Sequence, residues 1–260
     1  MSMDLVPVWV IFAATIVVVM LAIEAGHRLG HAAHRRSEDE KESPVSAFAG
    51  AVLGLVAFML AFTFSIVSNR YDARKELVRN EANAIGTAYL RADFLPEPDR
   101  AEAKQLFKEY LYKRIEFAQR DYELEHLLKM LPDAERIQGR LWDMAVANAR
   151  LDMNSDVAAL YIESLNEVID IHALRVAIGA HARIPLGIWS VLVGLTILGM
   201  IGVGYHTGIA GSKRSLATLI LALSFAMVIG LIASLDRPGG FIKVTQQPLI
   251  DLQHSITAGE

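Results

Sequence analysis

The sequence of 260 residues contains no cysteine, which excludes disulfide bonds, thiol catalysis and metal sites built on cysteine. It also lacks a large net charge of either sign, since its 25 Lys and Arg and 29 Asp and Glu give a net charge of -4. This balance does not favour a nucleic-acid partner. Nucleotide-binding glycine loops, Gly-x-Ser-x-Gly elbows and His-Glu-x-x-His metal motifs are missing too. We therefore expect neither an enzyme nor a resident cofactor.

Four apolar segments without Asp, Glu, Lys or Arg are the main positive feature of the sequence. Each is long enough to cross the hydrocarbon core of a bilayer as one helix. A charge at the bilayer centre costs roughly 2.5–3.5 kcal/mol, so uncharged runs of this length indicate membrane spans. Buried helices of a soluble protein rarely stay apolar on every face for so long. The predicted spans of this integral membrane protein are Leu5–Ile23, Val45–Val67, Ile184–Tyr205 and Leu216–Leu235.

A long polar stretch separates the first pair of spans from the second. It shows helical periodicity and no persistent strand pattern, so we expect an all-α fold with a helical extramembrane domain between spans 2 and 3. No proline lies between Val45 and Leu95. The second span is therefore expected to leave the membrane as one continuous helix, up to roughly 75 Å long at ~1.5 Å per residue. The predicted units are residues 1–69, 70–183, 184–235 and a C-terminal packing segment, 236–260.

Three apolar stripes at helical spacing are expected to form the core of the helical domain. Pro132, followed by acidic residues, is expected to mark the N-terminus of the second of these helices. His172 is more simply a packed histidine than a metal ligand. The stripes are Phe107, Leu111, Ile115 and Ala118; Ile137, Leu141, Met144 and Leu151; and Val157, Tyr161, Leu165, Val168 and His172.

The segment Gly26–Pro44 is rich in His, Arg, Glu and Asp and is expected to be a solvated or headgroup-facing loop, since Gly26 and Gly30 disfavour a helix. Its histidines nevertheless recur at helical spacing, and two glutamates would extend the same face, as in a metal site. Arginines crowd the same stretch, and a metal is not the favoured interpretation. The side chains concerned are His27, His31, His34, Glu24 and Glu38.

The second span and its continuation carry a face suited to line a pore. Steps of three and four residues from Phe58 keep to one side of a helix and pass from aromatic to polar to acidic side chains. Hydrophobic constrictions can gate by dewetting, and carboxylate rings favour cations. The alternative is lipid contact for the phenylalanines and a solvated charge collar. The expected constriction is Phe58 and Phe62, the further lining Gly54, Ser65 and Asn69, and the charge-selective ring Asp72 and Glu76.

Phe58–Phe62 running into Asn69–Lys75 is similar to the second membrane helix of bacterial bestrophins, and Ile184–Leu186 is similar to the start of their third. Leu235–Gly240 and Gln247–Leu252 resemble the segments after their fourth helix. The whole pattern resembles the bacterial bestrophin-like family. The resemblance implies a homopentameric channel of the bacterial inner membrane, with the helical domain and both termini cytoplasmic and two aromatic residues in the pore neck.

Two features qualify this resemblance. Bestrophins carry a dense acidic calcium site after the fourth span, where this sequence has Asp236 beside Arg237, so calcium activation is not expected. The two short loops, between spans 1 and 2 and between spans 3 and 4, carry six Lys and Arg near the membrane ends. The side of the membrane with the helical domain carries eight, so the positive-inside rule does not orient the chain. We expect an oligomer in the lipid bilayer, a pentamer by the resemblance, that conducts monovalent cations. The alternative is a non-conducting scaffold or sensor that relays a signal through its long helices.

Overall fold

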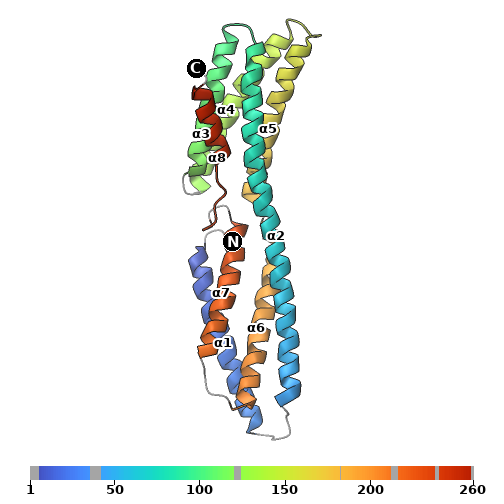
Figure 1. Ribbon diagram of the computed structural model, residues 1–260, viewed down its shortest axis with the longest axis vertical. Coiled ribbons are helices and arrows are strands. Elements are labelled where there is room, and N and C mark those ends of the chain that lie inside the picture. Colours follow the sequence, from blue (N-terminus) through green and yellow to red (C-terminus); the bar gives the residue numbers. More distant parts are fainter. Residues whose placement is uncertain are drawn as a thin grey trace. The chain divides into compact units, whose positions relative to one another are not determined.

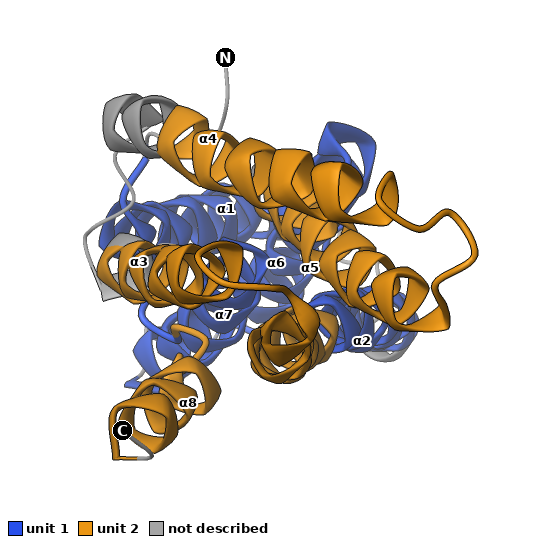
Figure 2. Ribbon diagram, turned by 90° about the horizontal axis from the view of Figure 1, so that it is seen from above, with its two compact units in different colours: residues 1–70, 183–242 blue, residues 71–182, 243–260 orange. Residues whose placement is uncertain are grey.

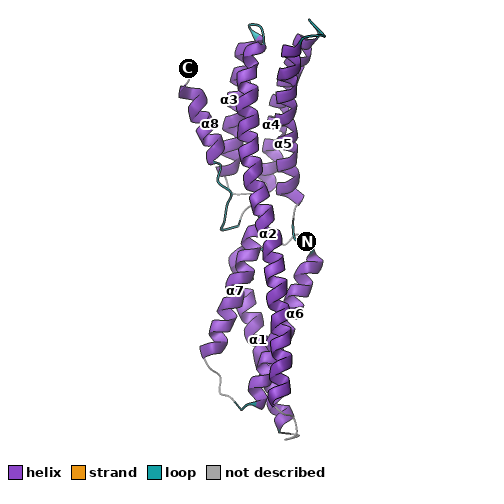
Figure 3. Ribbon diagram, turned by 45° about the vertical axis from the view of Figure 1, so that its right-hand side comes forward, coloured by secondary structure: helices purple, strands orange, loops and turns teal. Residues whose placement is uncertain are grey.

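The computed structural model describes residues 6–35, 42–119, 124–181, 183–211, 216–237 and 240–258. Within these ranges the regular elements are all helices (Figure 3), which confirms the predicted all-α fold. The first four α-helices are α1 (Val8–His34), α2 (Glu42–Arg91), α3 (Asp99–Gln119) and α4 (Leu124–Ala149), and the short 3₁₀ helix η2 (Ala92–Phe94) follows α2. The others are α5 (Asp156–His181), α6 (Leu186–Ile209), α7 (Leu216–Asp236) and α8 (Gln247–Ala258).

Four of these helices, α1, α2, α6 and α7, are long and apolar enough to cross a membrane, which confirms the predicted spans. The chain divides into two compact units (Figure 2). Unit 1 comprises residues 1–70 and 183–242, and unit 2 comprises residues 71–182 and 243–260. In unit 1, α1 packs along α6 and α7 (Figure 1).

The helix α2 belongs to both units. Its 50 residues form one uninterrupted helix, as the lack of proline between Val45 and Leu95 predicted. The helix begins at Glu42, so Pro44 lies in its first turn, where the missing N–H of proline costs no intrahelical hydrogen bond. The first part of α2 therefore offers side chains to the membrane unit and the second part to the helical unit.

The helix α1 continues to His34, well past the predicted end of the first span at Ile23. The expected loop from Gly26 was therefore wrong over this stretch. The reason is that Gly26 and Gly30 serve as contacts with α6, which compensates for their low helix propensity. A Cβ atom on Gly26 would lie only 2.1 Å from the carbonyl oxygen of Ile201.

Glycines of α6 make the same kind of contact from the other side. A Cβ atom on Gly204 would lie 2.1 Å from the carbonyl oxygen of Ile23, and one on Gly208 would lie 2.4 Å from that of His27. Small residues on both helices let the two backbones approach closely, which is how membrane helices gain packing energy without a hydrophobic driving force. The α1–α6 pair is thus held by glycines of both helices, of which only Gly26 and Gly30 were expected to disfavour a helix.

Gly204→Ala is expected to lower stability by about 1–3 kcal/mol, because its Cβ atom forces the α1 and α6 backbones apart. Gly194→Ala is the matched control, since a Cβ atom at Gly194 of the same helix meets nothing within 4 Å. Thermal unfolding of the purified protein in detergent should give a lower midpoint for Gly204→Ala only. Equal midpoints for the two variants would contradict the close packing.

Unit 2 is built around one apolar core. The predicted stripes supply it: Phe107, Ile137 and Leu165, for example, are fully buried. Leu151 and Val157 are exposed instead, because they lie at the turn between α4 and α5 and at the first turn of α5. The side chain of Ala118 lies outside the described residues.

Two further features complete unit 2. The predicted helix start at Pro132 was wrong, because α4 begins at Leu124 and runs through this proline. Ala134 and Ile137, just after it, are buried, so packing holds the helix together across the missing hydrogen bond. The C-terminal helix α8 packs on α3 and adds Leu249 and Ile256 to the same core.

A buried ion cluster ties four segments of unit 2 together. Glu81 of α2 is fully buried and accepts a hydrogen bond from Arg114 of α3, with 2.8 Å between Nε and Oε1. Arg175 of α5 donates to the other carboxylate oxygen of Glu81 and also to Gln246, at 3.1 Å. Burial lowers the pKa of Arg175 to about 10. Separating these side chains would leave a buried charge without its partner, which is strongly unfavourable. The cluster therefore holds α2 to α3, to α5 and to the segment before α8.

His172 is packed in the core, as its place in the third stripe predicted. Its Nδ1 atom lies 3.2 Å from the Tyr110 hydroxyl, which accepts a hydrogen bond from the Gln138 amide. Its Nε2 atom is buried and has no hydrogen-bond partner among the described residues. Burial, together with the nearby charge of Arg114, lowers the pKa of His172 to about 4. This imidazole is therefore neutral in the folded protein at neutral pH.

The pKa of His172 predicts a pH dependence of stability. The folded value of about 4 lies below the ordinary 6.5, so the unfolded chain takes up a proton first as the pH falls. The contribution of neutral His172 to the free energy of unfolding is fully present above about pH 6.5. It is lost as the pH falls from about 6.5 to about 4, which lowers the free energy of unfolding by up to about 3 kcal/mol. His172→Gln should therefore lose less stability than wild type between pH 7 and pH 5 in thermal unfolding. His254→Gln, at an exposed histidine of α8, is the control. The same loss in wild type and His172→Gln would contradict the assignment.

Candidate functional site

The helix α2 uses only one of its faces for packing in unit 1. Val56, Thr63 and Val67 on this face are fully buried. A Cβ atom on Gly199 of α6 would lie 3.5 Å from the side chains of Leu53 and Val56, so this face of α2 packs on α6. The opposite side of the helix is exposed among the residues that the structure describes, and it carries the candidate pore residues.

All the residues predicted to line a pore lie on this exposed side of α2. At ~100° per residue they fall within about 40° of Phe58 around the helix. The side chains of Phe58 and Phe62 are 64% and 51% exposed, and their rings stack with centroids 6.4 Å apart. Exposed with them are Gly54, Ser65, Asn69, Asp72 and Glu76. The predicted face is therefore one continuous exposed stripe of a single helix, with aromatic side chains followed by polar and acidic ones.

The stripe continues along α2 beyond Glu76, where the sequence prediction stopped. The same register reaches Asn80, Asn83 and Thr87, which are exposed as well. Their spacing was visible in the sequence, but Asn and Thr on a helix surface carry no signal that separates a pore wall from ordinary solvated surface. The structure shows that α5 lies beside this part of α2, which the sequence did not predict.

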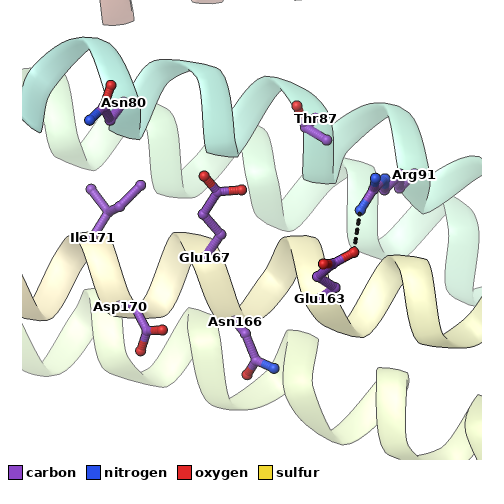
Figure 4. Close-up of a pocket in the computed structure, with 8 residues that line it drawn as sticks. All are labelled: Asn80, Thr87, Arg91, Glu163, Asn166, Glu167, Asp170 and Ile171. Atoms are coloured by element: carbon purple, nitrogen blue, oxygen red, sulfur yellow. Dashed lines mark ion pairs between the residues drawn. The ribbon is translucent and has the colours of Figure 1, made fainter.

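A groove of about 610 Å³ lies between α2 and α5 in unit 2 (Figure 4). Asn80, Thr87 and Arg91 line it from α2. Glu163 of α5 pairs with Arg91 at 3.7 Å, drawn as a dashed line in Figure 4. The lining from α5 comprises Glu163, Asn166, Glu167, Asp170 and Ile171. Acidic side chains of a second helix thus lie beside the continuation of the exposed stripe.

Two of the side chains considered as metal ligands, His27 and Glu24, contact other groups. His27 Nδ1 lies 3.3 Å from the Thr207 hydroxyl, so this histidine faces α6. Glu24 accepts a hydrogen bond from Arg28 at 2.7 Å, and Glu38 lies outside the described residues. Over the described ranges, no group of three or more His, Asp or Glu side chains could hold a metal ion.

At the end of the apolar part of α2, an ion pair joins this helix to the end of α7. Asp236, the last residue of α7, accepts a hydrogen bond from the backbone N–H of Ile184 at 3.0 Å. The same oxygen, Oδ1, accepts one from Arg70 Nη1 at 3.4 Å. Arg70 follows Asn69 directly but points away from the exposed stripe, toward α7.

Comparison with known proteins gives two kinds of match. A family model described as the bestrophin-like domain matches residues 11–249. Among solved structures, two mutant forms of a bacterial bestrophin homologue from Klebsiella pneumoniae share the fold, each with 13% identity. They give TM-scores of 0.63 and 0.66, covering 96% of this chain and 99% and 98% of theirs. A mutant form of a protein described as a membrane protein matches with a TM-score of 0.63 and 14% identity, over 97% of this chain and 96% of that one. No curated protein matches.

Proposed function

This chain belongs to the bestrophin-like family, and from that premise we propose that it forms an ion channel whose pore is lined by α2. The observation that carries the proposal is the exposed stripe from Gly54 to Glu76 on a membrane helix whose other face packs on α6. A ring of copies related by rotation, with this stripe turned inward, encloses a path across the membrane.

Such a ring gives each level of the stripe its own role. Phe58 and Phe62 form the narrowest, apolar part, which closes by excluding water. Ser65 and Asn69 follow with groups that hydrogen-bond to a partly hydrated ion. Asp72 and Glu76 then form rings of carboxylates at the mouth of the pore, which attract cations and repel chloride.

The assembly we propose is a pentamer in the bacterial inner membrane with unit 2 on the cytoplasmic side, in line with the resemblance to bestrophins. In a pentamer, the Asp72 and Glu76 side chains of the five subunits place a total of about ten carboxylates around the mouth of the pore. The acidic groove between α2 and α5 supports the same sign of selectivity, because it lies beside the continuation of the stripe. The transported species is a monovalent cation.

The competing function is a membrane scaffold or sensor without conductance. One observation favours it: α2 is a single helix of 50 residues shared by the two units, which suits the relay of a displacement. The two functions differ in whether a continuous path for ions exists.

Planar-bilayer recording and native mass spectrometry of the purified protein test the proposal together. We expect discrete current steps, absent from a mock preparation, and a particle of five times 28.6 kDa. A monomer or dimer at all concentrations, with no current above the mock preparation, would contradict the channel and favour the scaffold.

A further inference from the structure

Several hydrogen bonds join different segments of unit 1 at the end of α7. The side chain of Asp236 is only 7% exposed, and one of its oxygens accepts from both Ile184 and Arg70. Next to it, Arg237 donates a hydrogen bond to the backbone carbonyl of Val6. Asp236 thus holds the last turn of α7, the start of α6 and α2 at one point.

The residues that follow α7 pack closely against its last turn. The Ser234 hydroxyl accepts a hydrogen bond from the backbone N–H of Ile242, at 3.1 Å. A Cβ atom on Gly240 would lie 2.1 Å from the carbonyl oxygen of Ser234, so only glycine fits there. The carboxylate of Asp236 is therefore fixed in position by its surroundings, while Arg70, at 29% exposed, holds α2 to it through one flexible side chain.

We propose that the Arg70–Asp236 ion pair is a latch that holds α2 in the position at which Phe58 and Phe62 close the pore. This inference rests on the proposed channel function and adds a control element to it. Arg70 lies two turns beyond Phe62 on the same continuous helix, so a pair that anchors Arg70 restrains the constriction as well.

The physical reason for a latch is the cost of separating this pair. The Asp236 carboxylate is almost completely removed from water, so moving the positive charge of Arg70 away from it is unfavourable. The hydrogen bond from Arg70 Nη1 to Asp236 Oδ1 is nevertheless long, at 3.4 Å, whereas charge-assisted hydrogen bonds are ordinarily about 2.7–2.9 Å. This combination favours one position of α2 and still allows the helix to leave it.

The test is single-channel recording of the full-length protein carrying Arg70→Met, Asp236→Asn or both. Asp236→Asn retains an oxygen that can accept from Ile184 and removes only the charge. Each single variant should raise the open probability about 2- to 30-fold, the range found for mutations along coupled networks. The unitary conductance and reversal potential should stay unchanged, because Arg70 does not lie on the stripe. The double variant should equal the stronger single variant, since both substitutions break the same pair.

Arg28→Met is the matched control, because the Arg28–Glu24 pair also lies in unit 1 but Arg28 is exposed. Arg70→Lys keeps the charge and should give an intermediate open probability, which provides a readout if Arg70→Met does not fold. Unchanged or reduced open probability in the folded variants overturns the latch. A change in conductance or in reversal potential also overturns it, because it assigns Arg70 to the pore wall. Wild-type current in the same bilayers reports separately on the channel function itself.

Discussion

Replacing both Phe58 and Phe62 by alanine is expected to raise the current through the reconstituted protein about tenfold, which corresponds to a barrier lowered by about 1.4 kcal/mol. In the proposed ring, the two stacked phenylalanines of each subunit form an apolar neck from which water withdraws. Alanine widens the neck and lets water enter, so ions pass without losing their hydration. Single-channel recording at matched protein content measures the effect as a larger unitary conductance or a higher open probability.

Phe64→Ala is the control for this prediction. Phe64 is also an exposed phenylalanine of α2, but its position around the helix lies outside the stripe. Its replacement should leave the current unchanged. If instead the double alanine variant conducts like wild type and only its stability changes, then Phe58 and Phe62 face lipid and the neck lies elsewhere.

Removing the carboxylates of Asp72 and Glu76 should abolish most of the preference for cations. In a tenfold gradient of KCl, the wild-type reversal potential should lie near the potassium equilibrium value, about 59 mV from zero. Asp72→Asn/Glu76→Gln should move it toward zero, because the two rings no longer concentrate cations at the mouth. The shift should shrink as ionic strength rises, because the Debye length is only about 8 Å at physiological salt.

A variant with the same loss of charge elsewhere separates selectivity from net charge. Glu135→Gln/Asp143→Asn removes two exposed acids of α4, away from the stripe, and should leave the reversal potential where it is in wild type. A wild-type reversal potential at the chloride value would refute the cation preference. An unchanged potential in Asp72→Asn/Glu76→Gln would show that other residues select the ion.

Hydropathy and periodicity predicted most of this fold because they report on burial directly. The four spans follow from uncharged length alone, and the continuous helix α2 follows from the lack of proline. Core positions such as Phe107 and Leu165 follow from the helical repeat. These are local properties of the chain, and the structure confirms them.

Features that depend on a distant partner could not be predicted from the sequence. Gly26 and Gly30 counted against a helix until α6 supplied the backbone that they contact. The position of Arg70 off the stripe was predictable from helix geometry, but its partner Asp236 lies 166 residues away in the sequence. The same holds for the acidic wall that α5 adds beside α2, since nothing in the sequence pairs those two helices.

The exposed stripe itself lies between these two cases. Its members could be predicted from the sequence by counting along one helix. Whether that side of α2 is covered in the subunit could not be predicted, because covering depends on where α6 packs. In the described part of the chain the stripe is exposed, and the opposite side is buried at Val56 and Thr63.

Modification of a single introduced cysteine tests most directly whether α2 lines an ion pathway. The chain has no cysteine, so Ser65→Cys and Thr63→Cys each carry one thiol on opposite sides of α2. A charged methanethiosulfonate reagent should block the current of Ser65→Cys and leave that of Thr63→Cys unchanged, because Thr63 is fully buried against the rest of the subunit. Ser65→Cys that is fully labelled by mass spectrometry yet conducts as before would contradict a pore lined by α2.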